Sequence, residues 1–142
     1  MKKVAKGQVV VEMLLILPVF LTIIFTIMEI GYVSFQLILL NHATYEVARI
    51  AGMTTTSPGN CPAGVDTIMK QVIQSASATC TAEKTLTDPQ STQDNFDLII
   101  TGQNDIRLIF PISSAILAQP KGSGKRLLVA VVRMPIETPL KK

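Results

Sequence analysis

The sequence is poor in the side chains on which most enzymes depend. Its 142 residues include one histidine, His42, and two cysteines, Cys61 and Cys80. No histidine lies beyond residue 42 to activate Ser113 or Ser114, so a nucleophilic hydrolase is not predicted. Aromatic residues make up 5% of the chain, and no basic patch is interleaved with them, which argues against nucleic-acid binding. We therefore expect neither an enzyme nor a nucleic-acid-binding protein.

The sequence also lacks a complete motif for binding a cofactor or a metal ion. Residues 121–126 (KGSGKR) look like a phosphate-binding loop, but Gln119 holds the position of the earlier glycine and Arg126 replaces the Ser or Thr that binds magnesium. The acidic residues between 94 and 105 do not follow a calcium-loop spacing. A single histidine makes a metal site a poor interpretation, and we expect no cofactor.

Positive charge is concentrated at the N-terminus. Lys2, Lys3 and Lys6 account for three of the 13 basic residues, which leaves 10 to balance the 10 acidic residues of the chain. The sequence beyond residue 7 is therefore neutral. Subunits without net charge do not repel one another strongly when they pack side by side.

A long apolar run, Val9–Ile30, follows the basic stretch. It contains four polar residues: Glu12, Thr22, Thr26 and Glu29. A secretory signal has an apolar region of roughly 7–15 residues and ends in a small-x-small cleavage site, and this run fits neither criterion. Its length suits a transmembrane helix, which needs roughly 20 apolar residues. The lysines before it predict a cytoplasmic N-terminus and an exported remainder.

The helical pattern continues past the apolar run. Residues 34–51 contain no proline or glycine, and an apolar stripe recurs at spacings of three and four: Leu37, Leu40, Thr44, Val47, Ala48 and Ala51. His42, Glu46 and Arg49 fall on the opposite face, where they can interact in water. Gly52 and the following Thr, Ser, Pro and Gly residues predict the end of the helix.

The remainder, residues 53–142, resembles one small soluble domain. Apolar spacing predicts a second, amphipathic helix from Val65 to Ala76 with Asp66 as its N-cap, and the polar segment 79–95 is predicted to be a loop. Three strands are expected at 96–101, 105–110 and 126–133, the first two joined by a turn at 102–104. Residues 111–120 fit an irregular loop or a short helix. The fold class is thus α+β, with an antiparallel sheet packed against the emerging half of the long helix.

Cys61 and Cys80 both lie on the predicted exported side. In an oxidising compartment an even pair is most simply a disulfide. Closing a loop of that length stabilises the fold by about 3 kcal/mol in the chain-entropy model.

Two motifs near the N-terminus resemble a known family. GQVVVE at residues 7–12 resembles the recognition site of type IV prepilins, which prepilin peptidase cuts after the glycine. The continuation, with VEMLLILPVF at 11–20 and MEIGY at 28–32, is similar to the TadE-like proteins, minor pilins or pseudopilins of tight-adherence (Flp-type) pilus systems. Their helix carries a V-E, a P-V six residues after the glutamate, and an E-x-G near its outer end. The close match covers residues 7–52, and VVRMPIE at 131–137 is a weaker one.

The resemblance implies a role for the first acidic residue. Cleavage after Gly7 would leave Gln8 as the new N-terminus. An ionised side chain inside a membrane helix costs roughly 2.5–3.5 kcal/mol, and pairing of Glu12 with the freed amine of Gln8 on a neighbouring subunit would offset that cost and set axial register. The alternative is that Glu12 simply extends to the cytoplasmic headgroups.

Two further helix residues are assembly candidates. Pro18 removes a helix hydrogen bond and favours a kink or local unwinding, although membrane helices also tolerate proline. Glu29 lies about 30 Å beyond Val9 along a straight helix, at the outer interface, where it can pair with another pilin or be hydrated.

These expectations combine into one functional prediction. Residues 1–7 are a leader, 8–52 a transmembrane and packing helix, and 53–142 an exported head. The protein waits in the cytoplasmic (inner) membrane as a single-pass protein with its head outside, and after assembly it is part of an extracellular pilus. Its partners are prepilin peptidase, other pilin subunits, the pilus assembly platform and the membrane. The alternative is an uncleaved single-pass protein whose head binds a ligand or an envelope partner.

Overall fold

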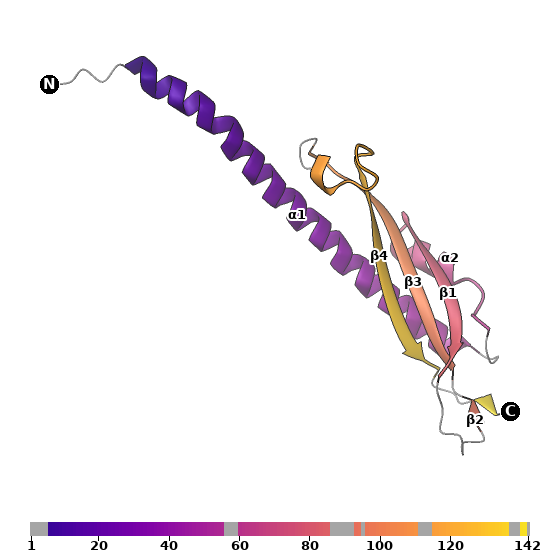
Figure 1. Ribbon diagram of the computed structural model, residues 1–142. Helices are drawn as coiled ribbons and strands as arrows, with labels where there is room; N and C mark the ends of the chain where they lie inside the picture. Colours follow the sequence, from indigo (N-terminus) through magenta and orange to yellow (C-terminus); the bar gives the residue numbers. More distant parts are fainter. Residues whose placement is uncertain are drawn as a thin grey trace. The chain divides into compact units, whose positions relative to one another are not determined.

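The computed structural model describes residues 6–55, 60–85, 93–94, 96–110, 115–136 and 140–141. Its elements, in chain order, are α1 (Lys6–Thr54), α2 (Val65–Val72), β1 (Ala76–Lys84), β2 (Gln93–Asp94), β3 (Phe96–Arg107), β4 (Lys125–Pro135) and β5 (Leu140–Lys141) (Figure 1). The predicted α+β class is confirmed: a long apolar helix is followed by a small head that contains the helix α2 and a three-stranded antiparallel sheet.

The chain divides into two compact units. The first unit comprises residues 1–34 and 107–126, and the second comprises residues 35–106 and 127–142. Predictions for residues 1–5, 56–59, 86–92, 111–114 and 137–139 lie outside the described residues, including those for most of the leader and for Ser113 and Ser114.

The sheet has the order β1-β3-β4, so β3 is its central strand. β1 and β3 pair antiparallel along their whole shared length, from Ala76 opposite Asn104 to Lys84 opposite Phe96. Burial alternates along both strands, which gives the sheet one inward face and one outward face. β2 and β5 form a separate two-stranded pair.

The core of the second unit lies between the inward face of the sheet and the two helices. The predicted stripe of α1 is confirmed as the buried face of that helix, except that Leu37 remains 37% exposed. The buried helix residues are Leu40, Ala43, Thr44, Val47, Ala48 and Ala51. Leu98 and Ile100 of β3 and Met69 of α2 also belong to the core and have no exposed surface.

α1 lies close to the sheet at Gly102. A Cβ atom at this position would lie 2.2 Å from Thr44 Oγ1 and 3.1 Å from Met69 Cε. These two neighbours show that α1 and α2 cover the same face of β3, as Figure 1 also shows. Thr44 keeps its hydroxyl satisfied by donating to Leu40 O at 2.7 Å. Glycine is needed here for space, because the strand has no room for a side chain.

The predicted turn at 102–104 is therefore wrong. β3 runs without interruption from Phe96 to Arg107, and Gly102 and Asn104 are inward-facing strand residues. Glycine and asparagine are typical of turns when only local sequence is considered. Here the close approach of α1 determines the glycine, and the expected strand at 105–110 is reduced to the last residues of β3.

The predicted loop at 79–95 is wrong over residues 79–84, which belong to β1, and at residues 93–94, which form β2. The inward positions of β1 carry small side chains, at Ala76, Ala78, Cys80 and Ala82, and the outward positions are polar. Such a strand has little apolar character of its own. Its pairing with the distant β3 supplies the stabilisation, which no local pattern reveals.

The second helix is shorter than predicted and is capped differently. α2 ends at Val72, and its N-cap is Gly64, whose φ of 90° lies in the left-handed region. Asp66 lies in the first turn instead. Its carboxylate accepts from Lys70 Nζ and, at 3.2 Å, from Ala78 N, and these contacts hold the pKa of Asp66 below its usual value.

A disulfide joins Cys61 to Cys80, 19 residues apart in sequence, and ties the segment before α2 to β1. On the outward face of the sheet, Arg133 of β4 bonds Asp97 of β3 at 2.7 Å and lies 3.7 Å from Glu83 of β1. These three residues come from the three strands of the sheet, so the charge cluster links all three on the outward face.

We expect Gly102→Ala to lower the free energy of unfolding by about 1–3 kcal/mol, because the new methyl group has to displace Thr44 or Met69. Thermal unfolding followed by circular dichroism in detergent measures this as a lower Tm. Gly31→Ala is the matched control, because a Cβ at Gly31 meets nothing within 4 Å and alanine favours helix. Equal Tm values for the two variants would contradict the close approach.

Candidate processing and assembly site

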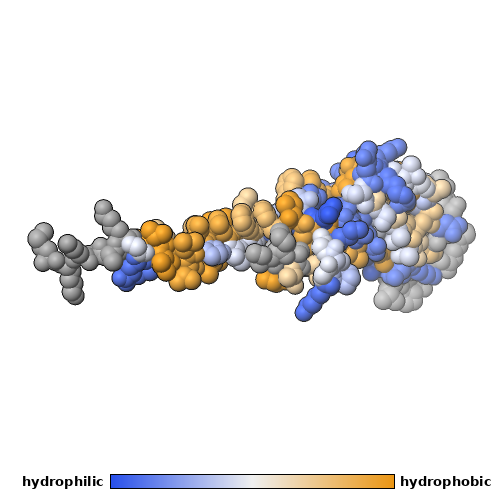
Figure 2. Space-filling model, turned by 90° about the horizontal axis from the view of Figure 1, so that it is seen from above, coloured by the Kyte–Doolittle hydropathy of each residue, from blue (hydrophilic) through white to orange (hydrophobic). Residues whose placement is uncertain are grey.

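The first half of α1 leaves its apolar side chains uncovered. Among the described residues one helix, Gly7–Thr54, is long and apolar enough to cross a membrane. Nearly every large apolar residue from Val9 to Ile30 is exposed, and Figure 2 shows hydrophobic surface along this part of the helix. Such a surface requires a non-aqueous environment, because contiguous apolar patches of this size are not left in water.

Gly7 lies in the first turn of α1, where nothing in the structure requires a glycine. A Cβ atom there would meet nothing within 4 Å. Glycine in a helix costs roughly 0.5–1 kcal/mol relative to alanine. The described part of the chain therefore offers no packing reason for the residue at this position.

Gln8 and Glu12 lie one turn apart on the exposed surface of α1. Gln8 Nε2 donates to Glu12 Oε1 over 3.4 Å, which is long for a hydrogen bond of this type. The contact leaves most of the hydrogen-bonding capacity of the carboxylate unused. Glu12 can accept a stronger donor from outside the chain.

α1 continues as a helix through Pro18, so the structure shows no unwinding there. Thr22 Oγ1 donates to Pro18 O at 2.7 Å, and Thr26 Oγ1 donates to Thr22 O at 2.8 Å. Both hydroxyl groups are thus satisfied inside the helix, as an apolar environment requires.

Glu29 differs from Glu12 in having no exposed surface at all. Its Oε1 accepts from Ile109 N and its Oε2 from Phe110 N, each at 3.0 Å. Phe110 also stacks on Phe25, with ring centroids 4.8 Å apart and the planes 13° from parallel. All four residues belong to the first unit. Within the chain, Glu29 therefore binds backbone amides, which neither of the two sequence-based alternatives included.

Sequence reasoning missed the amides of residues 109 and 110 because it predicts a strand there. In a strand these amides would donate to the carbonyl groups of a neighbouring strand. The available signal was indirect. Glu29 is a carboxylate in an apolar helix without a nearby cation, so it needs donors from elsewhere in the chain.

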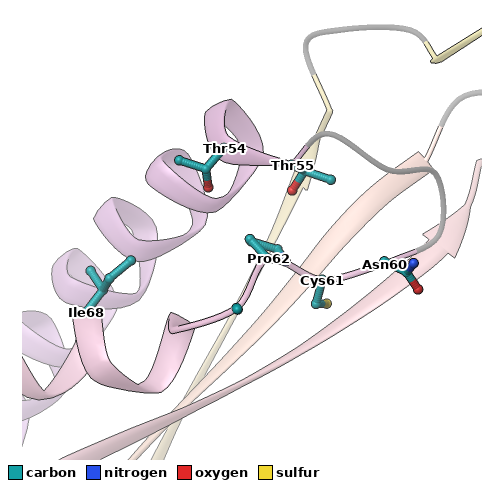
Figure 3. A pocket seen from close by; sticks show the side chains of 7 residues that line it. Thr54, Thr55, Asn60, Cys61, Pro62 and Ile68 are labelled. Atoms are coloured by element: carbon teal, nitrogen blue, oxygen red, sulfur yellow. The ribbon is translucent and has the colours of Figure 1, made fainter.

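A cavity of about 400 Å³ lies in the second unit, between the end of α1, the segment at the disulfide and the start of α2 (Figure 3). It is lined by Thr54, Thr55, Asn60, Cys61, Pro62, Ala63 and Ile68. Both threonine hydroxyls donate to carbonyls of α1, and the cysteine is in the disulfide. The lining contains no ionisable group, so this cavity has no evident catalytic chemistry.

The long uncovered helix has the length and composition of a membrane anchor. The family model described as TadE-like protein matches residues 7–49. This match confirms the resemblance seen in the sequence, and it covers most of α1 but none of the head. TadE-like proteins are a structural family associated with tight-adherence pili. Comparisons with curated proteins and with solved structures gave no match.

We expect Glu29→Gln to weaken the contact with residues 109 and 110, because an amide offers one acceptor oxygen and places an NH₂ group against an N–H donor. Loss of one hydrogen bond to a charged group costs about 1.5–3 kcal/mol. Hydrogen–deuterium exchange of the full chain in detergent should show faster exchange at the amides of Ile109 and Phe110. Glu12→Gln, at an exposed position of the same helix, should leave those amides unchanged. Unaltered exchange in the Glu29 variant would refute the contact.

Proposed function

We propose that this chain is a minor pilin or pseudopilin that prepilin peptidase cleaves between Gly7 and Gln8. It then assembles through its N-terminal helix into a tight-adherence-type pilus or its initiation complex. The observation that carries the proposal is the uncovered apolar surface of residues 9–30, which the chain itself does not bury. Lipid covers this surface before assembly, and the helices of neighbouring subunits cover it afterwards.

The proposed topology follows from charge and hydropathy. Residues 1–7 form the leader, with Lys2, Lys3 and Lys6 holding the N-terminus in the cytoplasm. Residues 8–52 span the membrane and pack against other subunits, and residues 53–142 form the exported head. The disulfide between Cys61 and Cys80 agrees with an oxidising compartment for the head.

Cleavage after Gly7 accounts for a glycine that the helix does not need. A residue without a Cβ allows an extended backbone to lie close to a protease surface. The family match also begins at residue 7, which supports a role for this glycine in processing and not in folding.

Glu12 is the proposed partner of the new N-terminus. The amine of Gln8 on one subunit carries a positive charge after cleavage, and the weakly satisfied carboxylate of Glu12 on its neighbour accepts it. In apolar surroundings the pair tolerates little displacement, so it sets the axial register between subunits. Pro18 lies farther along the same helix and stays in the proposed assembly region, whereas Glu29 has no exposed surface to offer another subunit.

Mass spectrometry of the protein purified from its native membrane should give a mature chain that starts at Gln8. Gly7→Val should leave a full-length chain, because the added side chain keeps the backbone away from the protease. The variant should still insert in the membrane, because a Cβ at this position meets nothing within 4 Å. Gly31→Val, at a second open helix position, is the control and should be processed normally. An intact Met1 in wild-type cells with active prepilin peptidase would favour the uncleaved single-pass alternative.

Glu12→Ala should be processed and inserted normally, yet it should reduce pilus formation strongly. The reason is that the neighbouring amine then lacks a counter-charge. Electron microscopy and shearing of surface filaments measure the effect. The control is Glu46→Ala, which removes an exposed carboxylate paired with Arg49 on the same helix. Wild-type piliation in the Glu12 variant would eliminate the register role.

A further inference from the structure

The first unit contains, besides the apolar half of α1, the connection between β3 and β4 with the adjoining strand ends, residues 107–110 and 115–126, which we call the interfacial loop. Hydrogen bonds fold it on itself. Leu108 N donates to Gly124 O at 2.9 Å, Gln119 N to Lys125 O at 2.9 Å, and Arg126 Nη1 to Leu117 O at 3.2 Å. The two ends of the loop therefore lie together, and its described residues form one surface element.

The contact with Glu29 determines the height of this loop along the helix. Ile109 and Phe110 are held at Glu29 by two amide hydrogen bonds and by the stacking of Phe110 on Phe25. Glu29 lies 20 residues after Val9, about 30 Å along the helix, which equals the thickness of the hydrocarbon core. When Val9 is at one membrane boundary, the interfacial loop is at the other.

The side chains of the loop suit that position. Ile109 is 63% exposed and Ile116 is 70% exposed. Between residues 107 and 126 the sequence has four basic residues and no acidic residue: Arg107, Lys121, Lys125 and Arg126. Lys121 and Lys125 are exposed. Exposed apolar side chains combined with cations are typical of segments that lie in the interface of an anionic membrane.

We propose that the interfacial loop is a second membrane contact, on the head side of the span. Ile109 and Ile116 enter the interfacial region of the bilayer, and Lys121 and Lys125 bind anionic phospholipid headgroups. Glu29 is the positioning residue that holds the loop at this depth. The proposal rests on membrane anchorage by α1 and not on pilus assembly, so it can fail while the proposed function stands.

The natural chain contains no tryptophan, so one introduced tryptophan reports a single position. The full chain with Ile116→Trp is reconstituted in vesicles of phosphatidylcholine and phosphatidylglycerol. Lipids brominated close to the headgroup probe membrane contact, and aqueous iodide probes water exposure. Val131→Trp is the control, because Val131 is similarly exposed, at 61%, on β4. Circular dichroism and an intact disulfide verify folding of both variants.

We expect emission from the Ile116→Trp variant to be blue-shifted and to show severalfold stronger quenching by brominated lipid than emission from the control. Equal quenching by iodide in the two variants would overturn the proposal. A tryptophan protected from both quenchers would also overturn it, because a second copy of the chain would then cover the loop.

Charge dependence is tested in the same background. Combining Ile116→Trp with Lys121→Glu and Lys125→Glu should reduce lipid quenching, and so should vesicles of phosphatidylcholine alone or a high salt concentration. Lipid quenching that is insensitive to all three changes would overturn the headgroup contact of the lysines.

Discussion

Helix α1 has to satisfy two different surroundings with one continuous backbone. Its residues 9–30 leave large apolar side chains uncovered, whereas its stripe from Leu40 to Ala51 closes the core of the second unit. A helix can do both because its backbone hydrogen bonds are internal and only the side chains face the environment. The rest of the structure depends on this helix, since removing its second half would expose the inward face of the sheet.

The two carboxylates in the apolar half of α1 differ in burial and in hydrogen bonding. Glu29 is buried and is satisfied inside the chain by two backbone amides, whereas Glu12 is exposed and makes one long contact with Gln8. A carboxylate in apolar surroundings needs donors, and the described residues provide two close ones for Glu29 but only a long one for Glu12. This asymmetry makes Glu12 the better candidate for a contact between subunits, and it gives Glu29 a role in holding the chain's own loop.

Much of the fold was predictable from local patterns. The apolar run, the stripe with spacings of three and four, and the glycine-rich stop after Ala51 predict α1 closely, because helix contacts are local. The errors concern β1, the turn at 102–104 and the end of α2. For β1 and for the turn, a contact between distant residues overrides local preference: the small alanines of β1 pair with β3, and Gly102 lies against α1 instead of forming a turn.

The sequence by itself determined the class of protein, because a basic start, a long apolar run and the motifs at residues 7–12 and 28–32 are all contiguous patterns. It also marked both cysteines and both helix carboxylates as notable. Only the tertiary structure decided that Glu29 meets Ile109 and Phe110, since 80 residues separate the partners and backbone amides have no sequence signature. The same is true of the packing of Gly102 against Thr44, which arises when distant segments meet in the fold.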